Sequence, residues 1–465
     1  MADSFIKLSF QDGTLIVAAP ADTDLPLSEH CQYDERIHAW RAEAMAYATV
    51  VRLLHTRQVD YDDQARGYDK LALQLNGGPA PRDYQRDALH AWVQADCRGV
   101  VVLPTGTGKS FVAQLAIARA SRTTLVVVPT LDLMEQWASQ LATAFGQDIG
   151  LLGGGSKDIR DLTVSTYDSA AIMMEFIGKR FGLLVVDECH HLPGPAYQLL
   201  ARFTIAPFRL GLTATPERND GADEVLDELL GAICFRRDID EMEGAVLSPY
   251  RTERVGVTLD PDEAEEYAAT RAVYVNFLRA QRINLASAQG WSQFLIACAR
   301  QRGGREALRS FLRQRHIAQA GRAKLRQIWE LLQEHHGERV LIFTADNQTA
   351  YEIGQRFVLP VITHHTKIAE RRELLGAFRA GELPVLVTSK VLNEGVDVPE
   401  ASVGIVVSGS GSIREHEQRL GRILRPVAGK QAVLYELISA DTAECYVSNR
   451  RRQHRAYERP DSLSH

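Results

Sequence analysis

Short, fully apolar runs alternate with longer segments of helical periodicity along most of this 465-residue chain. The runs in the first half are Gly99–Leu103, Thr124–Pro129, Leu162–Thr166, Leu183–Asp187 and Leu210–Thr213. Strands that are apolar along their whole length, joined by helices, are typical of a parallel sheet covered on both faces. The pattern therefore predicts an α/β domain at residues 80–246.

A second set of apolar runs predicts another parallel sheet, with strands at Val340–Thr344, Pro384–Ser389, Val403–Ser408 and Ala432–Leu437. Residues 262–320, between the two sets, have helical periodicity and no strand pattern. We therefore expect a second α/β domain at residues 247–455, with a helical insertion at about 262–320.

Residues 1–75 predict a separate, small α/β domain. Asp12-Gly13 lies between two apolar runs, which indicates a β-hairpin. A helix is expected from about Glu35 to Thr56, on the spacing of Ile37, Trp40, Met45, Ala48, Val51 and Leu54. Asn76-Gly77-Gly78-Pro79 then predicts a linker.

Composition narrows the class of protein. Apolar residues make up 45% and charged residues 24% of the chain, as in globular proteins with two to four domains at this length. No apolar run is long enough to cross a membrane, and the N-terminus lacks a signal-peptide pattern. The six cysteines form no CxxC pair, so neither a zinc site nor a disulfide framework is indicated. We expect a cytoplasmic protein.

The net charge of −6 is unevenly distributed. Residues 267–326 contain twelve Lys or Arg and one acid, Glu306. Such a basic block indicates a surface for a polyanion, although a solvated helical face remains the alternative. We favour Arg302, Arg305 and Arg309 as phosphate contacts. Most of the aromatic residues among these arginines are expected to be packing core.

The sequence LPTGTGKS at Leu103–Ser110 has the spacing of a phosphate-binding loop, except that Leu103 stands where the first glycine is usual. Glycines let successive backbone N–H groups turn toward phosphate oxygens, and the following helix contributes its positive end. Lys109 is expected to reach the β- and γ-phosphates, and Ser110 to bind Mg²⁺. We assign nucleotide binding to Thr105, Gly106, Thr107, Gly108, Lys109 and Ser110.

Asp187 and Glu188 end a buried apolar strand. Asp187 is expected to hold Mg²⁺, and Glu188 to orient the attacking water or accept its proton. Far along the chain, QRLGRILR contains Gln418, Arg422 and Arg425. Its arginines are candidates to stabilise transition-state charge on the γ-phosphate.

These motifs resemble superfamily 2 helicases over residues 80–445, and DECH at Asp187–His190 resembles the DEAD/DEAH box. The resemblance implies two RecA-like domains and an ATP site completed by both. It assigns nucleotide contacts to Tyr84, Gln85, Gly395 and Asp397, and coupling to Thr213 and Thr215 in GLTATP. It assigns contacts with a nucleic-acid strand to Thr130, Thr166, Thr344 and Thr388, which lie in VVVPTLDLMEQW, VSTYDSA, VLIFTADN and TSKVLNEGVDVP.

Within that superfamily the chain is most similar to the XPB helicases in their short archaeal and bacterial form. The likeness rests on residues 33–54, which resemble a damage-recognition domain, on the helical insertion, which resembles a thumb, and on residues 217–221. In the last of these, Arg218 and Asp220 match a strand-separating Arg-Glu-Asp element, but Asn219 replaces its glutamate. The resemblance implies ATP and Mg²⁺ as cofactors, 3′-to-5′ movement on DNA, a role in repair or transcription, and a nuclease partner.

Three functions stay open on sequence grounds. The first is an ATP-dependent DNA helicase or translocase, acting as a monomer or in a hetero-complex at the prokaryotic nucleoid. The second is an ATP-gated DNA clamp with weak unwinding, which recruits a nuclease or another repair partner. The third, a small-molecule kinase, leaves Arg422 and Arg425 unexplained. RNA as the track is also open, because backbone contacts need not read a 2′-hydroxyl.

Overall fold

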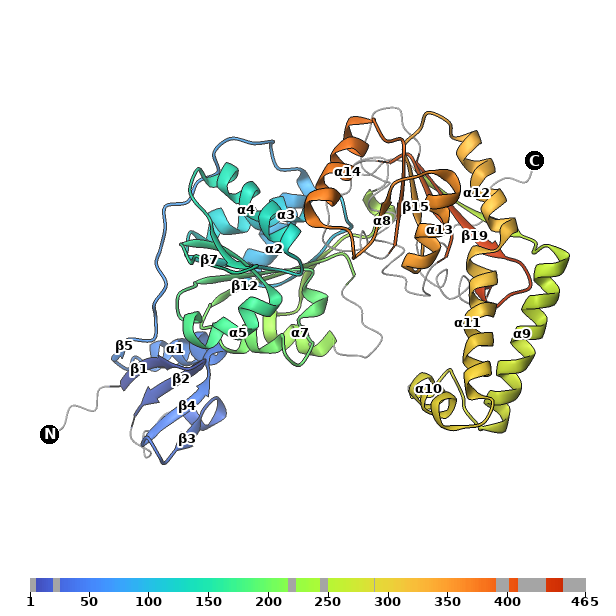
Figure 1. Cartoon of the computed structure of the whole chain (residues 1–465). Helices are drawn as coiled ribbons and strands as arrows, with labels where there is room; N and C mark the ends of the chain where they lie inside the picture. The colour runs from blue at the N-terminus through green and yellow to red at the C-terminus, as the bar shows by residue number, and fades with distance from the viewer. Residues whose placement is uncertain are drawn as a thin grey trace. The chain divides into compact units, whose positions relative to one another are not determined.

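The computed structural model describes residues 6–19, 26–215, 223–242, 250–287, 289–389, 401–408 and 432–445 (Figure 1). These residues form two units, with the boundary between Glu241 and Met242. The described helices include none that is long and apolar enough to cross a bilayer.

The N-terminal module begins with the predicted hairpin. β1 (Ile6–Gln11) pairs antiparallel with β2 (Thr14–Ala18), and Asp12 and Gly13 between them both have positive φ angles. The five strands lie in the order β3-β4-β2-β1-β5, with β3 at Gln32–Asp34, β4 at Ala39–Glu43 and β5 at Tyr61–Asp63. One helix, α1 (Tyr47–Thr56), packs on this sheet, and its buried residues are Tyr47, Val50 and Leu54.

The predicted helix from Glu35 was wrong in its first half. Residues 35–38 form the turn between β3 and β4, where His38 has a positive φ angle and Arg36 bonds to Asp34. Trp40 packs edge-on against Tyr33 across the two strands. Most of the apolar residues that suggested one helix therefore belong to two elements, β4 at Ala39–Glu43 and α1 at Tyr47–Thr56, which are separated by only three residues.

The first sheet has eight strands in the order β13-β6-β12-β11-β7-β10-β8-β9, and all its pairs are parallel except β8 with β9. β13 spans Ile233–Arg236, β8 spans Gly150–Gly153 and β9 spans Ser156–Lys157. The predicted strands are observed as β6 (Arg98–Val102), β7 (Thr124–Val128), β10 (Leu162–Thr166), β11 (Leu183–Asp187) and β12 (Phe208–Thr213). Helices α2 (Asp83–Gln94), α3 (Lys109–Ala120) and α4 (Leu131–Phe145) cover one face (Figure 1). α5 (Tyr167–Ile177) and α7 (Asp223–Leu230) cover the other, with α6 (Gln198–Arg202) beside α5.

The N-terminal module is bonded directly to this first sheet domain. The N–H of Gly13 donates to the carbonyl of Glu175 (3.1 Å), and a Cβ at Gly13 would lie 2.5 Å from the ring of Phe203. Arg202 bridges Glu43 of the module and Glu228 of α7, at 2.8 Å to each. The close approach needs a glycine, so the hairpin turn also serves as the docking point.

The second parallel sheet has six strands in the order β14-β19-β18-β15-β17-β16, with β14 at Tyr250–Val257 and β16 at Val361–Ile362. The predicted strands are observed as β15 (Val340–Phe343), β17 (Val385–Thr388), β18 (Val403–Val406) and β19 (Ala432–Ser439). α12 (Arg322–Glu334), α13 (Asn347–Phe357) and α14 (Ile368–Ala380) accompany it. Buried Lys324 joins α12 to the end of β19, because its Nζ donates to Glu444 (2.6 Å) and to the Val407 carbonyl (2.7 Å).

Between β14 (Tyr250–Val257) and α12 the chain forms the expected helical insertion, which we call the thumb. α9 (Pro261–Ala280) and α11 (Gly304–Ala320) lie side by side, and α10 (Gly290–Arg300) packs at their far end (Figure 1). Its aromatic residues pack together around fully buried Phe294, as the sequence predicted.

Candidate ATP site and nucleic-acid surface

The phosphate-binding loop connects β6 to α3. Gly106 and Gly108 have φ angles of 83° and 85°, which a side chain would strain. Thr107 is buried, and its hydroxyl donates to the Pro104 carbonyl (2.8 Å). Lys109 Nζ donates to the carbonyl of Leu103 (3.2 Å), so the ammonium group lies across the loop. A loop of this form can present backbone N–H groups and the ammonium group of Lys109 to a phosphate.

Tyr84 and Gln85 hold the same loop from α2. The Tyr84 hydroxyl and the Gln85 amide both donate to the Thr107 carbonyl. The Gln85 side-chain oxygen also accepts from the Arg82 N–H (3.0 Å), which completes a capping box at the start of α2. These two residues therefore fix the position of α2 against the loop.

Asp187 lies at the carboxyl end of β11 with its side chain 8% exposed. Its Oδ2 accepts from the indole N–H of Trp137 (2.9 Å), and its Oδ1 accepts from the N–H of Glu188 (3.0 Å). Burial and the neighbouring Glu188 raise the pKa of Asp187 to about 6, against the opposing effect of Lys109. The carboxylate is thus a buried negative charge that a cation would stabilise.

Glu188 has a left-handed backbone conformation, with φ of 48°, which is rare outside glycine. Its carbonyl and that of Asp187 both accept from the hydroxyl of Tyr167, at 3.1 and 2.9 Å. This turn directs the Glu188 side chain to 3.4 Å from His190. Strain held in place by buried bonds is typical of functional sites.

Three buried side-chain oxygens, in the loop and at the ends of β11 and β12, have no hydrogen-bond partner among the residues that the structure describes: Thr105 Oγ1, Glu188 Oε2 and Thr215 Oγ1. Buried polar atoms are almost always bonded, so a cluster of unsatisfied ones indicates a polar ligand. An acidic pair, a serine hydroxyl and a phosphate loop are also a donor set suited to Mg²⁺ with a nucleotide. The residues present therefore fit both groups.

Of the two threonines predicted to couple the site, Thr213 ends β12 and Thr215 lies two residues beyond it. The Thr213 hydroxyl donates to the Thr215 carbonyl (3.1 Å) and lies 3.0 Å from His190 Nδ1. Thr213 thus contacts the acidic motif through His190. The link joins the end of β11 to the end of β12.

Thr130 and Thr166 are the N-caps of α4 and α5. Each hydroxyl accepts a backbone N–H of its own helix, from Leu133 (3.3 Å) and Ser169 (3.4 Å). Both threonines precede a helix whose first N–H groups are available to an anion. That position is compatible with contact to a phosphate backbone.

Thr344 and Thr388, in the second sheet, are completely buried. The Thr344 hydroxyl donates to the Asp346 carbonyl (2.8 Å), and the Thr388 hydroxyl to the Ser389 carbonyl (3.0 Å). Neither hydroxyl has an exposed surface for a strand, so in this conformation the two side chains serve the fold.

Several predicted site residues lie outside the described part of the chain. They are Gly395, Asp397, Gln418, Arg422, Arg425, Arg218 and Asp220, together with the substituted Asn219.

The basic block of the thumb divides into two parts. Near the start of α9, Arg313 pairs with Glu266, Arg322 with Asp262, and Arg326 with Asp260. Those acids precede residue 267, so the sequence count overstated the excess of positive charge. Arg302, Arg305 and Arg309 are exposed, and no acid among the described residues pairs with them. The free charge is therefore concentrated at the far half of the thumb.

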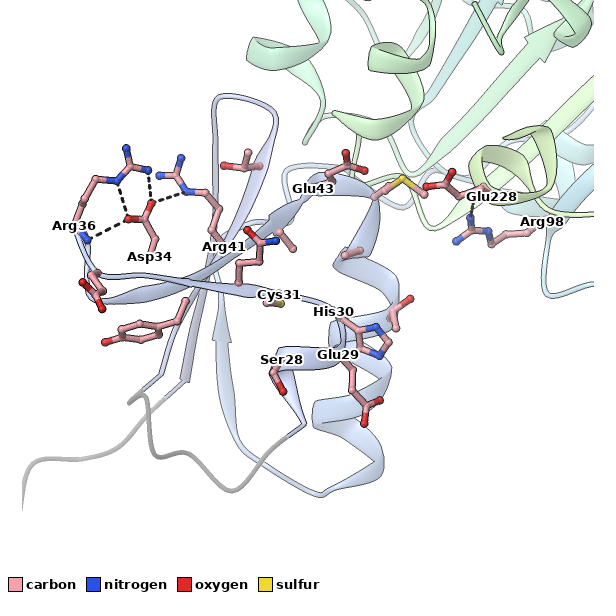
Figure 2. A pocket seen from close by; sticks show the side chains of 18 residues that line it. Ser28, Glu29, His30, Cys31, Asp34, Arg36, Arg41, Glu43, Arg98 and Glu228 are labelled. Carbon is pink, nitrogen blue, oxygen red and sulfur yellow. Dashed lines mark hydrogen bonds and ion pairs between the residues drawn. The ribbon is translucent and has the colours of Figure 1, made fainter. Parts of the chain in front are cut away.

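A cavity also lies where the N-terminal module meets the first sheet domain (Figure 2). Arg36 and Arg41 point to Asp34 there, and Arg98 lies beside Glu228. The lining contains five acids and three arginines: Glu29, Asp34, Glu35, Glu43, Glu228, Arg36, Arg41 and Arg98. This balance disfavours a nucleic-acid backbone in the cavity itself.

Sequence reasoning missed three residues that contact the acidic pair: Trp137, Tyr167 and His190. Each lies inside a motif that the sequence had singled out. Their roles depend on partners 20 to 50 positions away, or on tertiary contact with β12, and no local pattern reveals such partners.

Family comparisons cover most of the chain. Residues 8–65 match the damage recognition domain of the Xeroderma pigmentosum group B helicase. Residues 79–218 match the type III restriction enzyme res subunit, and residues 311–456 match the ERCC3/RAD25/XPB C-terminal helicase.

Curated relatives belong to the same family as the matching family models. The chain is 37% identical over 423 residues to the DNA 3′-5′ translocase XPB2 of Sulfurisphaera tokodaii, covering 91% of this chain and 95% of that protein. It is 32% identical to the DNA 3′-5′ helicase XPB of Mycobacterium tuberculosis, covering 80% of this chain and 63% of that protein. It therefore spans nearly all of the first protein and less than two thirds of the second.

Among solved structures, S. cerevisiae Dbp5 bound to RNA and ADP BeF3 matches with a TM-score of 0.55 at 15% identity, over 80% of this chain and 87% of that one. Together, the two parallel sheets and the phosphate loop define a helicase core with RecA-like domains. The chain belongs to the XPB family of superfamily 2 helicases.

Proposed function

We propose that this chain is a DNA-dependent ATPase that moves 3′-to-5′ along DNA and separates its strands during repair or transcription-linked remodelling. The observation that carries the proposal is the cluster of unsatisfied polar atoms around Lys109 and Asp187 in a chain of this family. Relatives described as DNA 3′-5′ translocases and helicases support the polarity and the track.

In this proposal the first sheet domain binds the triphosphate. The loop from Thr105 to Ser110 holds the phosphates, with Lys109 at the β- and γ-phosphates. Ser110 and Asp187 would hold Mg²⁺, which neutralises charge that develops on the phosphate oxygens. Glu188 accepts the proton of the attacking water, and its unsatisfied Oε2 is the candidate acceptor.

The second domain is proposed to complete the site. Gln418, Arg422 and Arg425 are assigned to the γ-phosphate, and Gly395 and Asp397 to the nucleotide, on the resemblance of their motifs. Tyr84 and Gln85 are assigned to the base, next to the loop that they brace. ATP would then favour one arrangement of the two domains and hydrolysis the other, which is the basis of stepping.

Strand binding is proposed at the N-caps Thr130 and Thr166, at Arg218 and Asp220, and on Arg302, Arg305 and Arg309 of the thumb. The unpaired state of the thumb arginines supports this part of the proposal, because paired guanidiniums are less available to phosphate. Residues 1–75 are proposed as a recognition module, 80–246 and 247–455 as the two motor domains.

The first test is the ATPase rate without nucleic acid and with single-stranded DNA, RNA and duplex DNA at one salt concentration. We expect strong stimulation by single-stranded DNA. A rate that no nucleic acid changes would contradict the proposal. Stimulation by RNA alone would mean that the protein moves along RNA and not along DNA.

The ATP-gated clamp is the second candidate, and Asn219, in place of glutamate, favours it. In that case ATP would tighten binding to DNA with little strand separation, and a nuclease partner would act on the bound site. A duplex with a 3′ single-stranded tail separates the two functions, because only the motor displaces the complementary strand. We place either activity in the cytoplasm, at the nucleoid.

A further inference from the structure

Two aromatic side chains connect the predicted strand contacts to the acidic pair. We propose that Trp137 and Tyr167 are positioning residues, which transmit DNA binding to Asp187 and Glu188. The inference deepens the proposed function and rests on it.

Trp137 controls the carboxylate of Asp187. Its indole N–H donates to Oδ2 (2.9 Å), and the ring is 2% exposed. The N–H of Glu188 holds the other oxygen, so the two donors together set the plane of the carboxylate. A hydrogen bond to a charged group is about twice as strong as a neutral one, and burial excludes water as a substitute.

Tyr167 controls the backbone of the same segment. Its hydroxyl lies within 2.9 Å of the Asp187 carbonyl and 3.1 Å of the Glu188 carbonyl, and the residue is buried. These bonds fix the turn in which Glu188 has its positive φ angle. Trp137 thus orients the side chain of one acid, and Tyr167 orients the backbone that presents the other.

Both residues lie on helices that begin at a proposed strand contact. Thr130 is the N-cap of α4, and Trp137 lies two turns further along, about 10 Å at the rise of an α-helix. Thr166 is the N-cap of α5, and Tyr167 is its first residue. A helix moves as a rigid element over such lengths, so a shift imposed at either threonine reaches the acidic pair through one hydrogen bond.

The same arrangement occurs on two neighbouring strands. β7 leads to Thr130, β10 leads to Thr166, and the acidic pair ends β11, which pairs with β7. Two helices, two capping threonines and two aromatic donors therefore converge on one dipeptide. A core that required only apolar packing would not need either polar donor.

Both Trp137→Phe and Tyr167→Phe remove the hydrogen-bond donor; the second keeps the ring, and the first replaces the indole with a smaller aromatic ring. We expect the ratio of the DNA-stimulated to the basal ATPase rate to fall about fivefold or more in each variant, the lower range of allosteric coupling. The second readout is the Kd for a single-stranded oligonucleotide with and without ADP-beryllium fluoride and Mg²⁺. In the variants the two Kd values should approach each other.

The chain contains a matched control for each change. Trp92 is equally buried and donates its indole N–H to the Arg209 carbonyl (2.9 Å), away from the acidic pair. Tyr47 is buried in the N-terminal module, and its hydroxyl donates to Asp63 (2.6 Å). Trp92→Phe and Tyr47→Phe should leave both ratios as in the wild type.

The possible outcomes distinguish failure of the proposed function from failure of the coupling role of Trp137 and Tyr167. A wild type that DNA does not stimulate overturns the proposed function and this inference with it. A stimulated wild type with unchanged ratios in Trp137→Phe and Tyr167→Phe overturns only the inference, as does an equal loss in the controls. If Trp137→Phe melts below the assay temperature, Tyr167→Phe alone decides.

Discussion

The two parallel sheets differ in how their polar groups are satisfied. At the carboxyl ends of the first sheet's strands, Glu188 and Thr215 have buried oxygens without a hydrogen-bond partner among the described residues, and Asp187 is a buried charge. At the corresponding ends of the second sheet, the hydroxyls of Thr344 and Thr388 are bonded within the domain.

The difference shows that similar architectures can carry different tasks. The first sheet maintains unfavourable polar groups that a nucleotide and a cation would satisfy. At the described strand ends of the second sheet the two threonine hydroxyls are bonded within the domain, and Arg302, Arg305 and Arg309 of the thumb are exposed without a described acidic partner. Among the residues described at the strand ends, the comparison therefore predicts that mutations in the first sheet will mainly change activity, and that loss of a bonded hydroxyl in the second sheet will mainly lower stability.

The largest expected effect is that of Lys109→Ala. Loss of the ammonium group removes the charge at the β- and γ-phosphates, and ATP hydrolysis should fall at least about 10³-fold, to background. Steady-state ATPase measurements test this, with circular dichroism as the check on folding. The exposed Lys157→Ala serves as the control, and a normal rate in Lys109→Ala would refute the site.

Arg425→Ala tests the contribution of the second domain. If the guanidinium stabilises transition-state charge, kcat should fall about 10³-fold while KM changes only a few-fold. Arg356→Ala, an exposed arginine of α13, should retain the wild-type kcat. An unaltered kcat in Arg425→Ala would mean that Arg425 does not take part in catalysis. The catalytic groups would then lie in the first sheet domain.

Asp187→Asn should make the metal-free protein more stable at pH 8. Because the pKa of Asp187 is raised in the folded state to about 6, its contribution to stability is present below pH 3.8 and is lost as the pH rises through 6. Melting temperatures in EDTA at pH 8 and pH 5 should show a gain for the variant that shrinks at the lower pH.

Exposed Asp96 is the control for that measurement, and Asp96→Asn should show no such pH-dependent gain. Equal melting temperatures of Asp187→Asn and the wild type at pH 8 would mean that the buried charge is already compensated.

Arg309→Ala should weaken binding to single-stranded DNA and lower the salt slope of log Kd by about one. Arg313→Ala is the matched control from the same helix, since Arg313 is already paired with Glu266 at 2.6 Å. Fluorescence anisotropy over a salt series measures both. Identical slopes for the two variants would mean that pairing within the thumb does not decide which arginines bind DNA.

The smallest effects should have opposite signs. Thr344→Val removes a satisfied buried hydroxyl and should cost about 1 kcal/mol of unfolding free energy. Thr215→Val removes an unsatisfied one and should be neutral or stabilising by up to about 1 kcal/mol. Urea denaturation of both variants checks the pair, and destabilisation by Thr215→Val would show that its hydroxyl has a partner.

The sequence predicted the central strands closely because they are apolar throughout. Leu162–Thr166 and Leu183–Asp187 were placed to the residue. Tyr250–Val257 was missed because its residues alternate in charge and it forms an edge of the second sheet. Val361–Ile362 is too short to leave a periodic signal.

The candidate site was predictable where one short segment carries the chemistry. The loop around Lys109 and the Asp187-Glu188 pair each have a local spacing that physical reasoning can interpret. The bond from Trp137 to Asp187 crosses 50 positions, and the burial of the Thr215 hydroxyl depends on tertiary packing. Features of that kind exist only once the chain has folded.

The seating of Gly13 against Phe203 has a practical consequence for truncation. Ile205, on the motor side, is part of the module's own core, and Met45 of the module packs against the core of the first sheet. A fragment that starts after residue 75 would therefore expose apolar surface that the module covers. In that fragment Arg202 would keep its ion pair with Glu228 and lose the one with Glu43. Loss of activity in such a fragment would therefore reflect damage to the first sheet domain itself, whatever residues 1–75 contribute to the choice of DNA.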